Sequence, residues 1–217
     1  MREIVFDTET TGFEPSDGHR IVEIACLELV NQIPTGRKKQ YYLNPERDMP
    51  EAAFRIHGIS EEFLRDKPRF AEVADDLMEF IGEAPLVAHN AEFDMRFLNA
   101  ELGLLKRAIV PLDRAIDTVR LARQRFPGSP VSLDALCKRF AIDNTQRTLH
   151  GALLDAQLLG GPQTGLSLTN AAEEAARAAL NVVGRIVRPA RPHAASAEEL
   201  ADHAAFVAKL KDAVWLG

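Results

Sequence analysis

The sequence has few cysteines, no long apolar run and no excess of positive charge. Only two of its 217 residues are cysteines, and Cys26 and Cys137 both lie in apolar periodic segments, so we expect reduced core residues of a cytoplasmic protein. No apolar stretch is long enough to cross a membrane, and the N-terminus leads into a strand pattern without a charged and apolar leader. A net charge of −6 argues against a protein that coats nucleic acid along its surface.

The chain length fits one domain with appendages. The apolar patterns predict three strands followed by alternating helices and strands, without an internal repeat. The expected strands are residues 3–9, 21–30, 40–44, 86–89 and 115–117. The expected helices are residues 60–65, 70–81, 91–102, 118–126 and 133–140, with a short helix after His150.

Asp7 and Glu9 are the most informative pair of residues in the sequence. Successive side chains of a strand point to opposite faces, so residues two apart present both carboxylates to one spot. Two such groups repel each other unless a cation neutralises them, and a hard divalent cation prefers oxygen ligands. A solvated pair of acids at a strand end is common, however. The pair therefore needs partners from elsewhere in the chain.

Two later segments supply such partners. An apolar strand pattern runs into Asn90, a good N-cap residue, and Asp94 follows in the first helical turn, where the helix dipole stabilises an anion. Acidic residues in first turns are also ordinary helix caps. Further on, His150 precedes a short helix that contains Asp155, and five residues of separation place the two on different helix faces. We therefore expect His150 to overhang, from a loop, a metal that Asp155 binds, although a lone histidine more often has a structural role.

In this order, the three segments resemble the DEDD-type 3'→5' exonucleases with a catalytic histidine, and among them the proofreading exonucleases of replicative DNA polymerases. The resemblance is dense over residues 2–168 and rests on the runs FDTETTG, HGIS, DKPRFAEVAD, HNAEFD, SLDALCKRF, IDNTQRTLHGALLDAQLL and QTGLSL. It implies a ribonuclease-H-like α/β fold, in which helices flank a mixed five-stranded sheet. The first three strands would be antiparallel, the others parallel, and the site would lie at strand ends.

The resemblance also implies the chemistry. The protein would remove mismatched nucleotides from a single-stranded 3' end of DNA as nucleoside 5'-monophosphates, with two divalent cations bound. Asp7 would bridge both cations, Glu9 and Asp155 would hold the one that activates water, and Asp94 would serve the other. His150 would be the general base, because histidine exchanges protons near neutral pH. The cations would be Mg²⁺ or Mn²⁺, since no cysteine and histidine spacing here forms a zinc site.

Four further residues match family positions near the terminal nucleotide. They are Thr10, Ile56, His57 and Phe93. These four assignments rest on the resemblance alone, and His57 could equally be structural.

The sequence changes in character near residue 160. We expect an exonuclease domain over residues 1–160, a flexible tether over residues 161–195 and a C-terminal helix over residues 196–217. The run Gly160-Gly161-Pro162 stops the helix of Asp155, which members of the family continue for about seven more residues, or two turns. The chain departs from the family pattern at this point, so the anchoring of that helix is in question.

Two segments beyond residue 160 are candidates for binding partners. Gln163, Leu166 and Leu168 are spaced like a short motif that docks on the sliding clamp, and an ordinary linker is the alternative. The C-terminal helix begins with a capping box from Ser196 to Glu199 and continues with apolar residues at helical spacing. In the family this tail binds the polymerase subunit, whereas a helix packed on the protein's own core is the alternative.

Two other classes of function stay open. A free-standing exonuclease that acts on RNA or small oligonucleotides would use the same five catalytic residues, but its chain would end near the nuclease domain. A replisome adaptor without enzymatic activity would keep the tail and lose activity through the shortened helix. The resemblance favours the proofreading enzyme at a cytoplasmic, nucleoid-associated replisome.

Overall fold

A computed structural model of the chain describes residues 1–144 and 150–160. All of them belong to the first of two compact units, Met1–Ala175. The expected clamp motif (Gln163, Leu166 and Leu168), the tether and the helix over residues 196–217 lie outside the described residues, so their structure stays a prediction. Within the described part of the chain, no helix has the length and apolar character that a membrane span requires.

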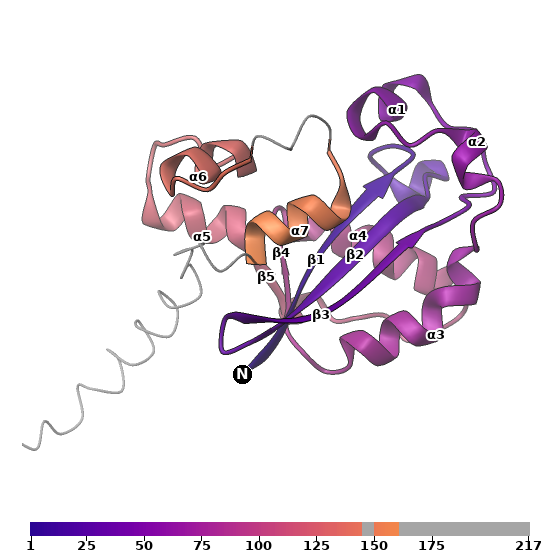
Figure 1. The fold of residues 1–217 in the computed structure, drawn as a ribbon. Helices are drawn as coiled ribbons and strands as arrows, with labels where there is room; N and C mark the ends of the chain where they lie inside the picture. Colours follow the sequence, from indigo (N-terminus) through magenta and orange to yellow (C-terminus); the bar gives the residue numbers. More distant parts are fainter. Residues whose placement is uncertain (145–149, 161–217) are drawn as a thin grey trace, which may run out of the picture. The chain divides into compact units, whose positions relative to one another are not determined.

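Five strands form one mixed sheet in the order β3-β2-β1-β4-β5 (Figure 1). The strand β1 pairs antiparallel with β2, which pairs antiparallel with β3, while β4 and β5 continue the sheet in parallel on the other side of β1. This arrangement confirms the expected fold class. The strands are β1 (Arg2–Thr10), β2 (Ile21–Val30), β3 (Ile33–Tyr42), β4 (Leu86–Ala88) and β5 (Ala115–Asp117).

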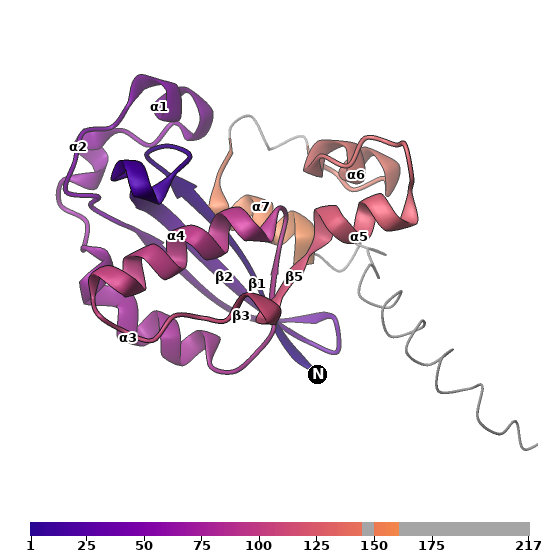
Figure 2. The ribbon, with the colours of Figure 1, turned by 180° about the vertical axis from the view of Figure 1, so that it is seen from behind.

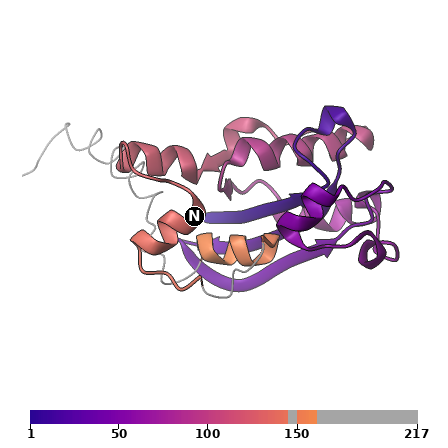
Figure 3. The same cartoon turned by 90° about the horizontal axis from the view of Figure 1, so that it is seen from above.

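Helices cover both faces of the sheet. The helices α3 and α4 pack on one face (Figure 2), and α7 lies along the other face, against β1 and β2 (Figure 3). The helices are α1 (Glu51–His57), α2 (Glu61–Leu64), α3 (Phe70–Ile81), α4 (Ala91–Leu104), α5 (Thr118–Arg125), α6 (Leu133–Arg139) and α7 (Ala152–Gly160). Two short 3₁₀ helices span Pro15–Asp17 and Leu112–Arg114.

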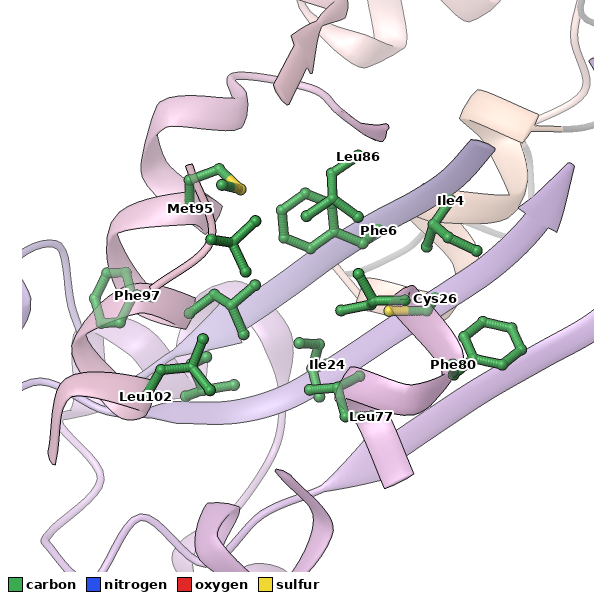
Figure 4. Packing of buried hydrophobic residues seen from close by; sticks show 14 of the residues in the cluster. Ile4, Phe6, Ile24, Cys26, Leu77, Phe80, Leu86, Met95, Phe97 and Leu102 are labelled. Atoms are coloured by element: carbon green, nitrogen blue, oxygen red, sulfur yellow. The ribbon is translucent and has the colours of Figure 1, made fainter. Parts of the chain in front are cut away.

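The main core lies between the sheet and the helices α3 and α4 (Figure 4). Alternate residues of β1 serve the two faces: Ile4 and Phe6 enter this core, whereas Val5 enters a smaller one beneath α6 and α7. Each such side chain contributes roughly 1.5–3 kcal/mol through burial. Cys26 and Cys137 are both buried, as expected, and burial raises the pKa of the Cys26 thiol to about 12.

Two elements differ from the sequence prediction. The strand β3 begins at Ile33 instead of residue 40, because Asn31 and Gln32 adopt φ of 52° and 66° and close a two-residue hairpin turn directly after β2. The helix α1 was not expected, since it is short and begins after Pro50. It ends at Gly58, whose φ of 71° is the left-handed conformation that terminates many helices. Other element ends agree within a few residues.

Asn90 is a correction to the expected capping. It occupies the N-cap position of α4, but its φ of 73° and ψ of 51° are left-handed, and its side chain makes no cap hydrogen bond. Its main-chain N–H instead donates to Asp117 Oδ1 over 3.1 Å, so the residue is held by the end of β5. Ser132 does cap α6 as expected, because its hydroxyl oxygen accepts from the Ala135 amide.

Candidate active site

Glu9, His150 and Asp155 come together where β1 meets the N-terminus of α7. One ligand atom from each of the three residues lies within 4.8 Å of the other two, and the His150 Nδ1 to Asp155 Oδ2 distance is 3.6 Å. Asp7 lies two residues before Glu9 in β1, so alternation places its side chain on the same face of the strand. Two segments more than 140 positions apart in the sequence therefore contribute to one group of side chains.

His150, in the loop before α7, and Asp155, in the first turn of α7, differ in their exposure to solvent. The Asp155 amide donates to the Gly151 carbonyl over 2.9 Å, which places this residue in the first helical turn. The His150 amide donates to the Ile56 carbonyl over 3.1 Å, which ties the loop to α1. The side chain of Asp155 is 6% exposed and that of His150 is 51% exposed. His150 therefore overhangs a buried carboxylate.

Asp94 reaches the site from the first turn of α4 and is fixed by Thr8. The main-chain N–H and the hydroxyl of Thr8 both donate to Asp94 Oδ1, over 2.9 Å and 2.7 Å. Both bonds engage the same oxygen, so Thr8 leaves Oδ2 for another partner. Thr8 points to the opposite face of β1 from Asp7 and Glu9, and it thereby links the α4 side of the sheet to the site.

The pKa values of two site carboxylates, Asp7 and Asp94, are raised. The pKa of Asp7 lies well above its ordinary value, first because of burial and then because of the charges of Asp94, Glu9, Asp155 and Glu23. Asp7 nevertheless lines the larger cavity described below and keeps some contact with solvent. Burial raises the pKa of Asp94 to about 7, although the hydrogen bonds from Thr8 oppose this shift. A cluster of buried acids fits a site for hard divalent metal ions, which take oxygen ligands.

Two cavities border this cluster. The larger, of about 750 Å³, is lined by Asp7, His150 and Asp155 and, across from them, by residues of α5 and of the segment that begins α6, including Arg123 and Ser132. The smaller, of about 260 Å³, lies beside Glu9. Its lining includes all four residues that match family positions near the terminal nucleotide, namely Thr10, Ile56, His57 and Phe93.

His57 is the most constrained residue of the smaller cavity. Its Nδ1 accepts the Ile59 amide over 3.0 Å, so the proton of a neutral ring is on Nε2. Nε2 is buried and has no hydrogen bond of normal geometry within the described residues. Burial lowers the pKa of His57, and the main chain of Thr10 offsets part of the effect. The lowered pKa favours the neutral form of the ring.

Comparison with known proteins identifies the family. A family model described as "Exonuclease" matches residues 4–160, and exonucleases of this family depend on metal ions. The chain is 49% identical to the DNA polymerase III subunit epsilon of Rickettsia felis over 228 aligned positions, which cover 97% of each chain. The chain belongs to the epsilon-subunit family of DNA polymerase III.

Other epsilon relatives and a solved structure agree. The Escherichia coli epsilon subunit is 46% identical over 221 positions, which cover 94% of this chain and 91% of that protein. The structure of exonuclease X in complex with 5' overhanging duplex DNA has a TM-score of 0.58 at 27% identity and covers 78% of this chain and 92% of that one. The alignment with the Rickettsia felis epsilon subunit spans 228 positions, which is more than the 217 residues of this chain. Gaps therefore interrupt this chain in the alignment.

The structure brings the five expected catalytic residues of this epsilon-family chain to one end of the sheet and adds residues that the sequence did not single out. Thr8 lies between Asp7 and Glu9 in the acidic motif, and the pattern of acids gave no reason to single it out. Glu23 is a buried carboxylate beside Glu9, and its only signal was that it is one of two acidic residues in the largely apolar run of β2. Asp117, which holds the Asn90 and Val119 amides, was expected only as the end of a strand.

Proposed function

We propose that the chain is the proofreading subunit of a replicative DNA polymerase and removes mismatched 3'-terminal nucleotides by 3'→5' phosphodiester hydrolysis. The observation that carries this proposal is the convergence of Glu9, His150 and Asp155 within 4.8 Å beside Asp7, in a chain of the epsilon-subunit family. The products would be nucleoside 5'-monophosphates, because water attacks phosphorus and the 3' oxygen leaves.

Each residue has a role that its environment supports. Asp7, Glu9, Asp94 and Asp155 would hold two divalent cations, Mg²⁺ or Mn²⁺, because these four carboxylates offer only oxygen ligands. When bound, such cations stabilise the charge of the phosphodiester in its transition state and of the leaving oxygen. His150 would accept the proton of the attacking water, since its ring is exposed and lies next to the carboxylate cluster.

The smaller cavity is the proposed site for the terminal nucleotide. Phe93 and Ile56 offer apolar surface to a base, and the His57 Nε2 proton and the Thr10 hydroxyl offer polar contacts. The Thr10 hydroxyl donates to the Gly12 carbonyl over 2.6 Å, which leaves its oxygen able to accept from a ligand. The position of this cavity beside Glu9 suits a nucleotide whose scissile phosphate reaches the carboxylates.

The epsilon relatives also suggest partners and location. Their name assigns them to DNA polymerase III, so we infer that this chain joins such a complex in the cytoplasm, at the nucleoid-associated replisome. Residues 196–217 would bind the alpha (polymerase) subunit, and Gln163, Leu166 and Leu168 would bind the sliding clamp. The division into domains over residues 1–160, 161–195 and 196–217 belongs to this proposal. The Rickettsia felis epsilon subunit matches 97% of this chain, a span that includes most of the tail, which disfavours a free-standing exonuclease.

A nuclease assay tests the proposal against its alternatives. The full chain, with Mn²⁺, is given a primer with a mismatched 3' nucleotide, the matched primer and an RNA strand of the same sequence. Preferential shortening of the mismatched DNA primer from its 3' end is the expected result. Comparable turnover of the RNA would indicate a free-standing exonuclease, and the absence of any turnover would indicate a replisome adaptor.

A further inference from the structure

Glu23 is a buried acid that the proposed chemistry does not use. It lies near the start of β2, is 2% exposed and pairs with Glu9 across the antiparallel register. No lysine or arginine within residues 1–144 and 150–160 forms an ion pair with it. A buried carboxylate without a cation is unfavourable unless hydrogen bonds stabilise it. The hydrogen bonds that Glu23 makes therefore indicate its role in the structure.

Both oxygens of Glu23 accept hydrogen bonds from neighbouring elements. Oε2 accepts the main-chain N–H of Ala152, the first residue of α7, over 3.1 Å. Oε1 accepts the side-chain amide of Gln40 in β3 over 2.7 Å. Glu23 thus links β2, β3 and α7, and the bond to Ala152 joins residues that are 129 positions apart.

The N-terminus of α7 needs such an acceptor. The first amides of a helix have no partner within the helix, and a preceding side chain usually caps them. The residue before α7 is Gly151, which has no side chain to do so. A carboxylate at this position also interacts favourably with the helix dipole. The sheet therefore supplies through Glu23 the cap that the local sequence lacks.

The position of the N-terminus of α7 determines where Asp155 and His150 lie. Asp155 occupies the first turn of α7 and His150 lies two residues before the helix, so Ala152 falls between them. The hydrogen bond from Ala152 to Glu23 fixes this segment to the sheet, next to Glu9. At its other side, the His150 amide is fixed to Ile56.

We propose that Glu23 is a positioning residue that caps α7 from the sheet and so places Asp155 and His150 against Glu9. The inference rests on the proposed function, because it explains how the metal site of that function is held. It also answers how α7 is anchored in a chain whose sequence predicts an early end to this helix. Loss of a residue that orients metal ligands typically weakens metal affinity by about 10–100-fold.

Four variants of the full chain separate this role from general stability. Glu23→Leu removes the acceptor but keeps a side chain of similar size in the core. Glu23→Gln keeps an oxygen for the Ala152 amide, and Gln40 can rotate its own amide to match. Glu28→Leu is the matched control, since Glu28 lies in the same strand and is similarly buried, but bonds Arg2 and Arg37 instead. Ala152→Pro removes the donor at a helix position whose backbone tolerates proline, and it also adds ring atoms at a fully buried residue.

Amide exchange of Ala152 in the metal-free protein and Mn²⁺ binding are measured in parallel. In Glu23→Leu we expect Ala152 to exchange at least about 10-fold faster and the half-saturating Mn²⁺ concentration to rise about 10–100-fold. Glu23→Gln and Glu28→Leu should resemble the parent in both measurements. Ala152→Pro should weaken Mn²⁺ binding as Glu23→Leu does. If Glu23→Leu does not fold, Mn²⁺ binding by Ala152→Pro tests the proposal in its place.

Two results would overturn the proposal. Parental Mn²⁺ binding in Glu23→Leu or in Ala152→Pro would show that the cap does not position the site. Weak Mn²⁺ binding in Glu23→Gln with Ala152 still protected would show that Glu23 acts through its charge instead. Neither measurement depends on hydrolysis, so a parent chain that leaves DNA intact would refute the proposed function and leave the result on Glu23 standing.

Discussion

The pKa of Asp7 is raised first by burial and then by the charges of four other carboxylates, and a bound cation would offset both effects. Because the folded pKa exceeds the ordinary value of 3.8, the unfolded chain releases this proton first, and the metal-free protein loses stability as the pH rises above that value. Asp7→Asn should therefore raise the melting temperature of the metal-free protein at pH 7. It should also lower nuclease activity by about 10²–10³-fold or more, through loss of transition-state electrostatics.

Thermal unfolding with EDTA and a primer-shortening assay with Mn²⁺ measure both effects of Asp7→Asn. Asp113→Asn, in the exposed turn Leu112–Arg114, serves as the control and should change neither quantity. Parental turnover in Asp7→Asn would contradict the assignment of Asp7 to the metal site.

His150 is the only exposed member of the group with Glu9 and Asp155, as expected for a residue that exchanges protons with water. His150→Ala should slow hydrolysis by about 10²–10⁴-fold, the usual range for loss of a general base, and leave Mn²⁺ binding largely intact. Turnover of single-stranded DNA and Mn²⁺ binding, measured for both proteins, provide the test. Parental turnover in the variant would mean that another group activates the water.

The residues that could be predicted from the sequence are those whose signal is local. Asp7 and Glu9 share a strand, and Asp94 lies in the first turn of a helix, so simple periodicity already orients them. Family resemblance then joins these segments to His150 and Asp155. Glu23 and Thr8 act through partners 129 and 86 positions away, and nothing near them in the sequence identifies those partners.

Among the elements, those with strong periodicity were predicted well and those defined by special turns were not. The expected boundaries of α3, β2 and β5 match the structure, and in α3 the apolar residues recur at helical spacing. The early part of β3 is exposed and polar, and its turn uses Asn31 and Gln32 without the glycine that usually marks such a hairpin. Tertiary pairing with β2, not local propensity, makes this segment a strand.

The end of the sheet formed by β1, β2 and β3 is held by a buried carboxylate at Glu28. It accepts hydrogen bonds from Arg2 Nε over 2.7 Å, from the Thr35 hydroxyl over 2.8 Å and from Arg37 Nη1 over 2.8 Å. The bond from Arg2, followed by that from Thr35, holds the pKa of Glu28 below its ordinary value of 4.5. A depressed carboxylate pKa stabilises the fold above pH 4.5, and this contribution is lost as the pH falls through the lower, folded pKa.

Glu28→Gln should accordingly lower the free energy of unfolding at neutral pH by about 1 kcal/mol, since both arginines are partly in water. The difference from the parent should shrink as the pH falls below 4.5. Urea unfolding between neutral pH and acid measures it, with Glu79→Gln at the end of α3 as a comparison. A difference that is constant with pH would mean that the loss arises from packing instead of charge.

On the scale of the whole molecule, the described residues contain the candidate active site, whereas the proposed partner-binding segments lie outside them. The sheet, its helices and both cavities lie within residues 1–144 and 150–160, which agrees with the extent of the exonuclease family model, residues 4–160. The epsilon relatives nevertheless match nearly the full chain, so the tail belongs to the same family pattern. We propose that residues 1–160 carry out hydrolysis and that residues 161–217 bind the partner subunits.

Deleting residues 196–217 should abolish copurification with the alpha subunit of DNA polymerase III and leave hydrolysis of single-stranded DNA unchanged. A capped helix of about five turns can lay an apolar stripe and Trp215 into a groove, and aromatic anchors often dominate such interfaces. Gln163→Ala with Leu166→Ala is the matched control, because a six-residue motif buries little area and is ordered only on binding, so its loss should weaken only clamp binding. If the deletion instead unfolds the nuclease domain, the helix packs on the protein's own core and the tail has no separate role in assembly.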